Sequence, residues 1–158
     1  MEYMKQMEKT MKIKTYKGAG IALFRKNSDV YCILLGKRTI NPDKGKWSIF
    51  GGKREPFDKS SFETAKREFK EECGLSFSSI KTKSFGECKF NLPFFKWTTF
   101  IFEVSESFRI PKHFGFEFSE LHFIPTNELK KYTVAFGVKK EIRTFLKNSA
   151  KIQKMCYN

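Results

Sequence analysis

GGKREPFDKSSFETAKREFKEECGL, residues 51–75, is the stretch that decides how the rest of the chain is interpreted. Its second half has the periodicity of one amphipathic helix. Ser60 stands where an N-cap belongs, and Glu63 follows it at the spacing of a capping box. Gly74 is placed to end the helix as a left-handed C-cap. Four apolar residues recur at helical spacing and predict one buried stripe: Phe62, Ala65, Phe69 and Cys73.

The opposite face of this predicted helix is acidic. Glu68, Glu71 and Glu72 stand at i, i+3 and i+4, so their carboxylates share one side of the helix. Arg67 is within reach of Glu71, but each pair of like charges still costs roughly a few tenths of a kcal/mol. Folding alone gains nothing from this arrangement, whereas a hard divalent cation takes oxygen ligands of this kind. A solvated acidic surface is the alternative interpretation.

The sequence around these acids resembles a known motif. Residues 67–75, REFKEECGL, closely resemble the signature of the Nudix hydrolase superfamily, in which Arg-Glu-hydrophobic-x-Glu-Glu-x-Gly-hydrophobic follows an upstream Gly and Glu. Gly52 matches the upstream Gly, whereas Asp58 stands where the family has Glu. One extra residue separates Asp58 from Arg67, and Phe57 occupies a place where Gly is common. These departures lie in the loop before the helix rather than on its acidic face.

The resemblance implies a divalent-metal site on the helix. Mg²⁺, with Mn²⁺ as a possible substitute, would be held by Glu68, Glu71 and Glu72. The main-chain carbonyl of Gly52 would complete the metal shell, because the family commonly uses the carbonyl near this Gly. A Gly permits the close approach that such a contact needs.

The resemblance also implies functional residues outside the helix. Many members carry a further Glu just before a late strand, aimed at the catalytic helix. Glu117 fits that place best and Glu120 is the second choice, either as a metal ligand or as a water-activating base. Glu68 is the other candidate for the general base, and Arg67 would orient the carboxylates from within the helix. Two exposed acids on an edge strand are the alternative for Glu117 and Glu120.

The implied reaction is hydrolysis of a diphosphate linkage in a nucleoside diphosphate-X substrate. Arg38 and Lys53 are candidates to neutralise phosphate oxygens, and Glu120 is a further candidate to bind the substrate. The favoured substrate is a nucleoside triphosphate or a related small nucleotide. Removal of 5′ phosphates or a cap from RNA is one alternative, and a catalytically silent domain that binds nucleotide or RNA is another. Dinucleoside polyphosphates and ADP-ribose also stay open.

Composition limits the class of protein and its partners. A chain of 158 residues fits one domain, and its 19 Phe residues supply a core and material for an aromatic-lined pocket. The four Cys show no metal-finger spacing, and no run has the length of a membrane span or the pattern of a signal segment, which predicts a cytoplasmic protein. The net charge of +14 suits nucleotide or RNA partners. A Lys-rich composition spread over solvated surfaces explains the charge equally well.

The order of predicted elements indicates the fold class. Residues 1–16 are expected to be a poorly ordered tail or a short helix, and residues 17–154 a single domain. Strands are predicted from apolar and β-branched runs, a long loop follows them, and a second helix ends the domain. This order suits an α/β (α+β) fold with a mixed β-sheet between helices, and the resemblance implies the α/β/α Nudix sandwich. The predicted strands cover residues 18–24, 30–36, 47–50, 77–90 and 97–104, followed by the loop 105–115 and, within 117–129, a late strand that continues into a short helix. The second long helix is predicted over 137–154, with Val138, Ile142, Phe145 and Leu146 as its buried stripe.

Overall fold

Strand β1 (Tyr16–Asn27) lies in the middle of a mixed sheet in the computed structural model, which describes residues 14–156. Within those residues the sheet has seven strands in the order β3-β2-β1-β6-β5, with β4 also paired to β1 and β7 to β2. Strand β1 runs parallel to β6 and antiparallel to β2 and β4. The other strands are β2 (Val30–Arg38), β3 (Trp47–Ser48), β4 (Phe50–Lys53), β5 (Thr82–Leu92), β6 (Phe95–Val104) and β7 (Phe118–Pro125).

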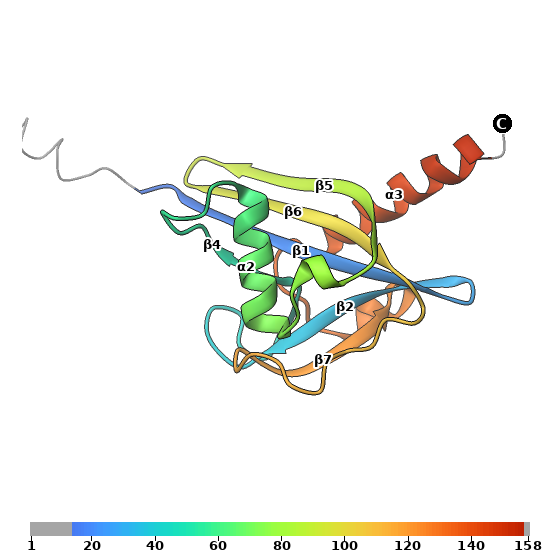
Figure 1. Ribbon diagram of the computed structural model, residues 1–158, viewed down its shortest axis with the longest axis horizontal. Coiled ribbons are helices and arrows are strands. Elements are labelled where there is room, and N and C mark those ends of the chain that lie inside the picture. The colour runs from blue at the N-terminus through green and yellow to red at the C-terminus, as the bar shows by residue number, and fades with distance from the viewer. Residues whose placement is uncertain (1–13, 157–158) are drawn as a thin grey trace, which may run out of the picture.

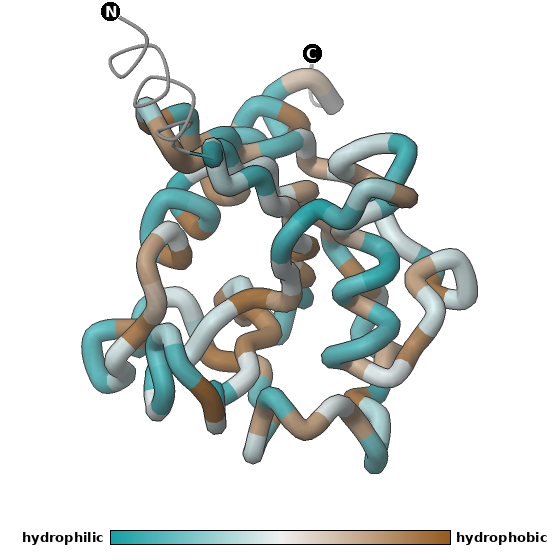
Figure 2. Tube along the Cα trace, turned by 90° about the vertical axis from the view of Figure 1, so that its left-hand side faces the viewer, coloured by the Kyte–Doolittle hydropathy of each residue, from teal (hydrophilic) through white to brown (hydrophobic). Residues whose placement is uncertain are grey.

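Helices α2 (Ser61–Cys73) and α3 (Val138–Cys156) cover opposite faces of this sheet (Figure 1). Side chains alternate along β1, so Ile21 packs with the core beneath α2 and Phe24 with the core beneath α3. Hydrophobic residues are distributed along the trace in short stretches between hydrophilic ones (Figure 2), as elements with one buried face require. The predicted α/β/α sandwich is therefore confirmed. Two 3₁₀ turns, η1 (Phe77–Ser79) and η2 (Thr126–Lys131), complete the described elements.

Helix α2 begins and ends where the sequence predicts. The Ser60 side chain accepts a hydrogen bond from the main-chain N–H of Glu63 at 3.1 Å, and Gly74 adopts a left-handed conformation with φ of 80°. Three members of the predicted stripe, Ala65, Phe69 and Cys73, are fully buried, and Phe62 packs against them at the edge. These contacts fix which face of α2 is left for the acidic residues.

Two predicted details are wrong. The segment from Phe77 was expected to be a strand, but η1 occupies its start. The main-chain carbonyl of Ser76 accepts hydrogen bonds from the N–H of Ser79 at 3.0 Å and from the Ser79 hydroxyl at 2.7 Å, which closes this turn. Strand β5 therefore begins only at Thr82. Leu146 was expected in the buried stripe of α3 but is 39 % exposed, because the face that meets the sheet is centred on Phe145.

The ends of the chain limit what can be compared. Residues 1–13 of the predicted N-terminal tail lie outside the described residues, and β1 already begins at Tyr16. The division into a tail and one domain over residues 17–154 stays a prediction. Among residues 14–156, no helix combines the length and the apolar character that crossing a membrane requires.

Candidate functional site

A cavity of about 670 Å³ opens beside the N-terminal half of β1 and has two chemically different ends. The polar end is formed by β4, α2, the end of β2 and the residue before β7. The aromatic end is formed by the β5–β6 hairpin, the first residue of β1, the end of β3, and the segment that leads into α3 with its first turn. The polar end is lined by Arg38, Pro42, Asp43, Gly51, Gly52, Lys53, Glu68 and Glu117, and the aromatic end by Tyr16, Ser48, Ile49, Phe90, Phe95, Trp97, Ala135, Phe136, Val138 and Glu141.

Glu72 lies directly behind the polar end. Its side chain is almost fully buried, and its Oε2 accepts a hydrogen bond of 2.7 Å from the main-chain N–H of Gly51. Burial raises the pKa of Glu72 to about 9, and the nearby carboxylates of Glu117 and Glu68 add to the effect. The Gly51 N–H acts in the opposite direction but does not compensate for burial. The carboxylates of Glu117 and Glu68 therefore lie close enough to that of Glu72 to repel it, which is costly without a cation.

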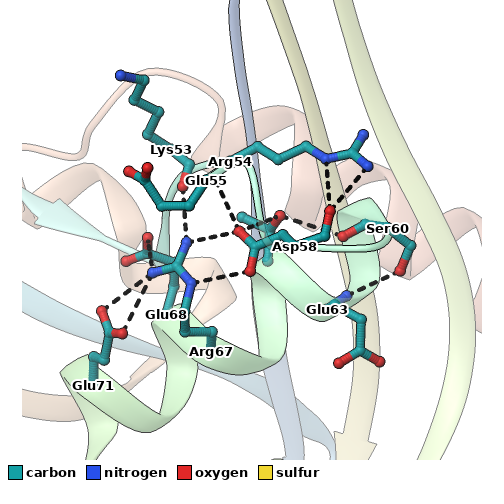
Figure 3. Close-up of polar contacts among 10 residues, drawn as sticks. Lys53, Arg54, Glu55, Asp58, Ser60, Glu63, Arg67, Glu68 and Glu71 are labelled. Atoms are coloured by element: carbon teal, nitrogen blue, oxygen red, sulfur yellow. Dashed lines mark hydrogen bonds and ion pairs between the residues drawn. The ribbon is translucent and has the colours of Figure 1, made fainter.

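Arg67 joins the acidic face of α2 to the loop before it (Figure 3). Its guanidinium donates to both carboxylate oxygens of Asp58, at 3.1 and 2.9 Å, and to the main-chain carbonyl of Lys53 at 2.9 Å. Its remaining nitrogen donates to Glu68 at 2.8 Å and lies 3.3 Å from Glu71. Arg67 thus holds the Glu68 side chain in place, and Asp58 holds Arg67.

Asp58 is well suited to this position although it departs from the family signature. It is buried and also accepts hydrogen bonds from the Thr64 hydroxyl at 3.0 Å and from the main-chain N–H of Glu55 at 2.9 Å. The hydrogen bonds from Arg67 hold the pKa of Asp58 down at about 2, against the effect of its burial. Asp58 therefore binds Arg67, Thr64 and Glu55 at once, although its side chain is shorter than that of Glu and the loop has one extra residue.

Gly52 packs directly against the Glu68 carboxylate. A Cβ atom at position 52 would lie 2.5 Å from the Cδ of Glu68, closer than real Cβ contacts allow. Only glycine leaves this space for the carboxylate beside the main chain of β4. Burial raises the pKa of Glu68, while the hydrogen bond from Arg67 lowers it.

The β6–β7 loop brings Glu117 to the same place. Gly115 donates its main-chain N–H to the carbonyl of Glu72 at 2.8 Å, which fixes the loop on the last turn of α2. Glu117 follows two residues later, lines the cavity and lies 3.7 Å from Arg38. The two predicted phosphate-binding residues, Arg38 and Lys53, also line the cavity. The Arg38 side chain is mostly buried, whereas Lys53 is exposed.

Two predicted site residues, and His113 of the β6–β7 loop, lie elsewhere. Glu71 does not line the cavity; its side chain is 58 % exposed and pairs with Arg67. Glu120 is not brought to the cavity either, because it lies across the strand pair from Lys37 and contacts that side chain at 3.4 Å. Of the two candidates for the additional acidic residue, only Glu117 lines the cavity. His113 is exposed and does not line the cavity.

The donor groups at the polar end fit a hard divalent cation. They are carboxylate and carbonyl oxygens, which Mg²⁺ and Mn²⁺ prefer, and the buried acids repel one another without a cation. In the part of the chain that the structure describes, no three acidic, His or Cys side chains stand together as a ready-made metal site. Arg67 instead engages Glu68 and Glu71. The fit therefore rests on the chemistry of the donors and their convergence.

Comparison with known proteins decides the family. The model of the NUDIX domain matches residues 14–145. This chain belongs to the Nudix family. Members of the family are typically pyrophosphohydrolases that use divalent metals, and the resemblance seen in residues 67–75 is confirmed. No curated protein sequence matched this Nudix chain significantly.

Solved structures share the Nudix fold with this chain. An Ap4A hydrolase from C. elegans in a binary complex has a TM-score of 0.68 and 15 % identity, over 87 % of this chain and 99 % of that one. RenU, a Nudix hydrolase from M. smegmatis, has a TM-score of 0.66 and 18 % identity over 88 % of both chains. The NUDIX domain of NrtR from Shewanella oneidensis, complexed with ADP ribose, has a TM-score of 0.63 and 18 % identity over 90 % and 94 %. At these identities the similarity establishes the fold.

Sequence reasoning missed the polar groups at the aromatic end of the cavity. Glu141 lies in α3 between Val138 and Phe145, so it is a lone acid within the apolar stripe of a helix. That position is a recognisable signal, because charged residues are rarely buried without a partner. Ser48 carries no comparable signal, since its exposure depends on how β3 pairs with β2.

Proposed function

We propose that this chain is a divalent-metal-dependent pyrophosphohydrolase that cleaves the diphosphate linkage of a nucleoside triphosphate or a related small nucleotide. The observation that carries the proposal is the two-ended cavity of about 670 Å³, in which Arg38, Lys53, Glu68 and Glu117 adjoin an aromatic end. A nucleotide has the same division into an anionic part and a flat aromatic part.

The polar end supplies the groups that the reaction needs. Glu68, Glu72 and Glu117, with Glu71 at the edge and the Gly52 carbonyl, would hold Mg²⁺ or Mn²⁺. Such an ion neutralises charge on the diphosphate and lowers the pKa of a bound water. Arg38 and Lys53 contribute further positive charge to the phosphate oxygens.

The general base is one of two carboxylates. Glu68 is held by Arg67 and packed against Gly52, so its position is fixed. Glu117 is less constrained, because its nearest cation is Arg38 at 3.7 Å. A base has to accept a proton from the attacking water, and both residues line the cavity where that water would stand. Replacing each by Gln and comparing the pH dependence of kcat separates them.

Glu72→Gln is expected to lower turnover by about 100-fold or more, the scale of losing a metal-site group or an electrostatic stabiliser. The same prediction holds for Glu71→Gln as a predicted ligand. The assay is phosphate release with Mg²⁺ over nucleoside triphosphates, dinucleoside polyphosphates, ADP-ribose and 5′-triphosphorylated RNA. Glu63→Gln is the matched control, since Glu63 lies on the same helix, is exposed and pairs with Lys66. Rates like those of the unchanged protein in both site variants refute the assignment.

The screen also separates the alternatives. Activity on RNA alone supports the RNA 5′-pyrophosphohydrolase that the net charge of +14 favours. Binding of nucleotide or RNA without turnover of any substrate supports a catalytically silent domain. Cleavage of small nucleotides by the unchanged chain, abolished in Glu72→Gln and retained in Glu63→Gln, supports the proposal.

A further inference from the structure

The aromatic end of the cavity contains a buried acid that lacks a partner for one of its oxygens. The Oε1 of Glu141 accepts a hydrogen bond from the Thr99 hydroxyl, whereas Oε2 has no hydrogen-bond partner among the described residues. The neighbouring cation does not compensate, because Lys140 turns its ammonium to the carbonyl of Lys89 at 2.6 Å. An unpaired buried carboxyl destabilises the folded state, so stability does not account for its presence.

A short relay of hydrogen bonds fixes the direction of Glu141. The indole N–H of Trp97 donates to the Thr99 hydroxyl oxygen at 2.9 Å, so the Thr99 hydrogen is left for Oε1 of Glu141. Thr99 is fully buried, which holds the arrangement rigid. The relay occupies Oε1 and leaves the buried Oε2 without a hydrogen-bond partner among the described residues, and Glu141 is one of the residues that line the cavity.

Flat aromatic rings line the same cavity as Glu141. The Trp97 ring lies against β1, where a Cβ atom at Gly18 would be 2.6 Å from the indole. Phe95 lies parallel to Trp97 with ring centroids 6.3 Å apart, and Tyr16 stacks on Phe95 at 5.4 Å. All three rings line the cavity. Such rings favour a planar heteroaromatic ligand, which stacks without needing a particular edge.

We infer that the aromatic end is a nucleobase subsite in which Glu141 selects bases that carry an exocyclic amino group. A carboxylate oxygen accepts and does not donate, so it pairs with an N–H and is repelled by a carbonyl oxygen at the same position. The buried Ser48 hydroxyl also lines this cavity and has no hydrogen-bond partner in residues 14–156, so it is available to a second polar atom of the base. This inference rests on the proposed function and names the class of nucleotide that the same site takes.

The test compares ligands that differ only in the amino group. GMP and IMP differ by the 2-amino group, and neither contains a diphosphate, so their binding is measured by calorimetry without any turnover. At about pH 8.5, above the pKa of about 7 to which burial raises Glu141, the carboxylate is ionised. The unchanged protein is expected to bind GMP about 10-fold or more tightly than IMP, the scale of a hydrogen bond to a charged group. The kcat/KM values for GTP and ITP should show the same preference.

Glu141→Gln is the decisive variant. Its amide keeps the shape of the carboxylate, and if one atom still accepts the Thr99 hydroxyl, an amide NH₂ replaces Oε2. The GMP preference should then fall to about 1 or reverse, since the group facing the base has become a donor. Trp97→Leu should weaken the binding of GMP and of IMP to a similar extent, because stacking on the ring does not depend on the amino group. Glu63→Gln should leave both affinities unchanged.

Equal affinities for GMP and IMP in the unchanged protein overturn the inference without any variant. Absence of binding by both, or a preference that survives in Glu141→Gln, overturns it as well. If GTP and ITP are hydrolysed equally well, the proposed function stands and the subsite assignment fails. If GMP is selected but no nucleotide is hydrolysed, the subsite assignment stands and the proposed function fails.

Discussion

At the scale of single residues, burial of carboxyl groups distinguishes this chain from an ordinary sheet-and-helix core. Glu72 and Glu141 are both nearly inaccessible, and burial raises the pKa of each, to about 9 and about 7. The two groups lie on α2 and α3, on opposite faces of the sheet. Each is placed next to the cavity rather than in the middle of a core cluster. Groups of this kind make stability depend on pH.

The free energy of unfolding should therefore depend on Glu141 in a defined direction. Its folded pKa of about 7 lies above the ordinary value of 4.5, so the folded chain binds the extra proton. The resulting stabilisation is complete below pH 4.5 and is lost as pH rises through 7. Relative to Glu141→Gln, the unchanged protein should lose roughly 2–3 kcal/mol between about pH 5 and pH 8.5. Urea unfolding of both proteins at the two pH values measures the difference, which cancels the contribution of Glu72. A difference that does not change with pH would contradict the prediction.

At the scale of elements, α2 is attached to the loop before it through Asp58. This carboxylate joins Arg67, Thr64 and the main chain of Glu55, so the helix and the loop are held as one unit. Because Arg67 also contacts Glu68, the position of the acidic face depends on a residue outside the helix. Loss of Asp58 should thus affect both stability and turnover.

Asp58→Asn should destabilise the chain by about 2 kcal/mol at neutral pH, since it removes one charge of a largely buried pair. Arg67 keeps Glu68 as a partner, which limits the loss. The pKa of Asp58 is lowered to about 2, so its contribution is present above the ordinary value of 3.8 and lost as pH falls through 2. Urea unfolding at neutral and acid pH checks this. Asp29→Asn, in the exposed β1–β2 turn, is the control and should change stability by less than about 0.5 kcal/mol.

Features of the fold and of the site could be predicted from sequence where residues close together in the chain determine them. The limits of α2 follow from Ser60 and Gly74, and its faces follow from helical periodicity. The choice between Glu117 and Glu120 was not local. It depends on how β7 pairs with β2, where the register shifts between Lys37 and Arg38 and leaves Glu120 opposite Lys37.

The aromatic end could be predicted only in outline. The 19 Phe residues of the chain indicate an aromatic-lined pocket, but composition does not say which rings reach it. Trp97 approaches Glu141 through Thr99, and these residues lie on β6 and α3, which meet only in the folded chain. Thr99 and Glu141 are 42 residues apart in the sequence, so no local sequence pattern predicts their contact. That Oε2 of Glu141 lacks a hydrogen-bond partner among the described residues follows only from the folded structure.

At the scale of the whole molecule, positive charge extends well beyond the cavity. The solvent face of α3 carries Lys139, Arg143, Lys147, Lys151 and Lys154, all exposed. The helix runs past the edge of the sheet, so the far end of this row projects away from the body of the chain (Figure 1). These charges stay available for a polyanion larger than a mononucleotide, and they are equally consistent with a solvated helix face.

A variant with Gln at positions 143, 147, 151 and 154 should separate these roles. Hydrolysis of a small nucleotide is expected to keep its kcat/KM within about 2-fold, because the altered side chains do not line the cavity. If RNA is the substrate, kcat/KM on 5′-triphosphorylated RNA should fall by about 10-fold or more at low salt, and the salt dependence should weaken. A large loss on the small nucleotide would show that the charge acts by steering even compact ligands.

The two ends of the cavity are built from different parts of the chain. The polar end comes from β2, β4, α2 and the residues around Glu117, while the aromatic end comes from the β5–β6 hairpin, Tyr16, β3 and the start of α3. Under the proposed function, chemistry and choice of substrate would be carried by largely separate segments on one scaffold. Exchanging the β5–β6 hairpin and the first turn of α3 for those of another Nudix chain would then change the choice of substrate and leave the polar end of the cavity unaltered.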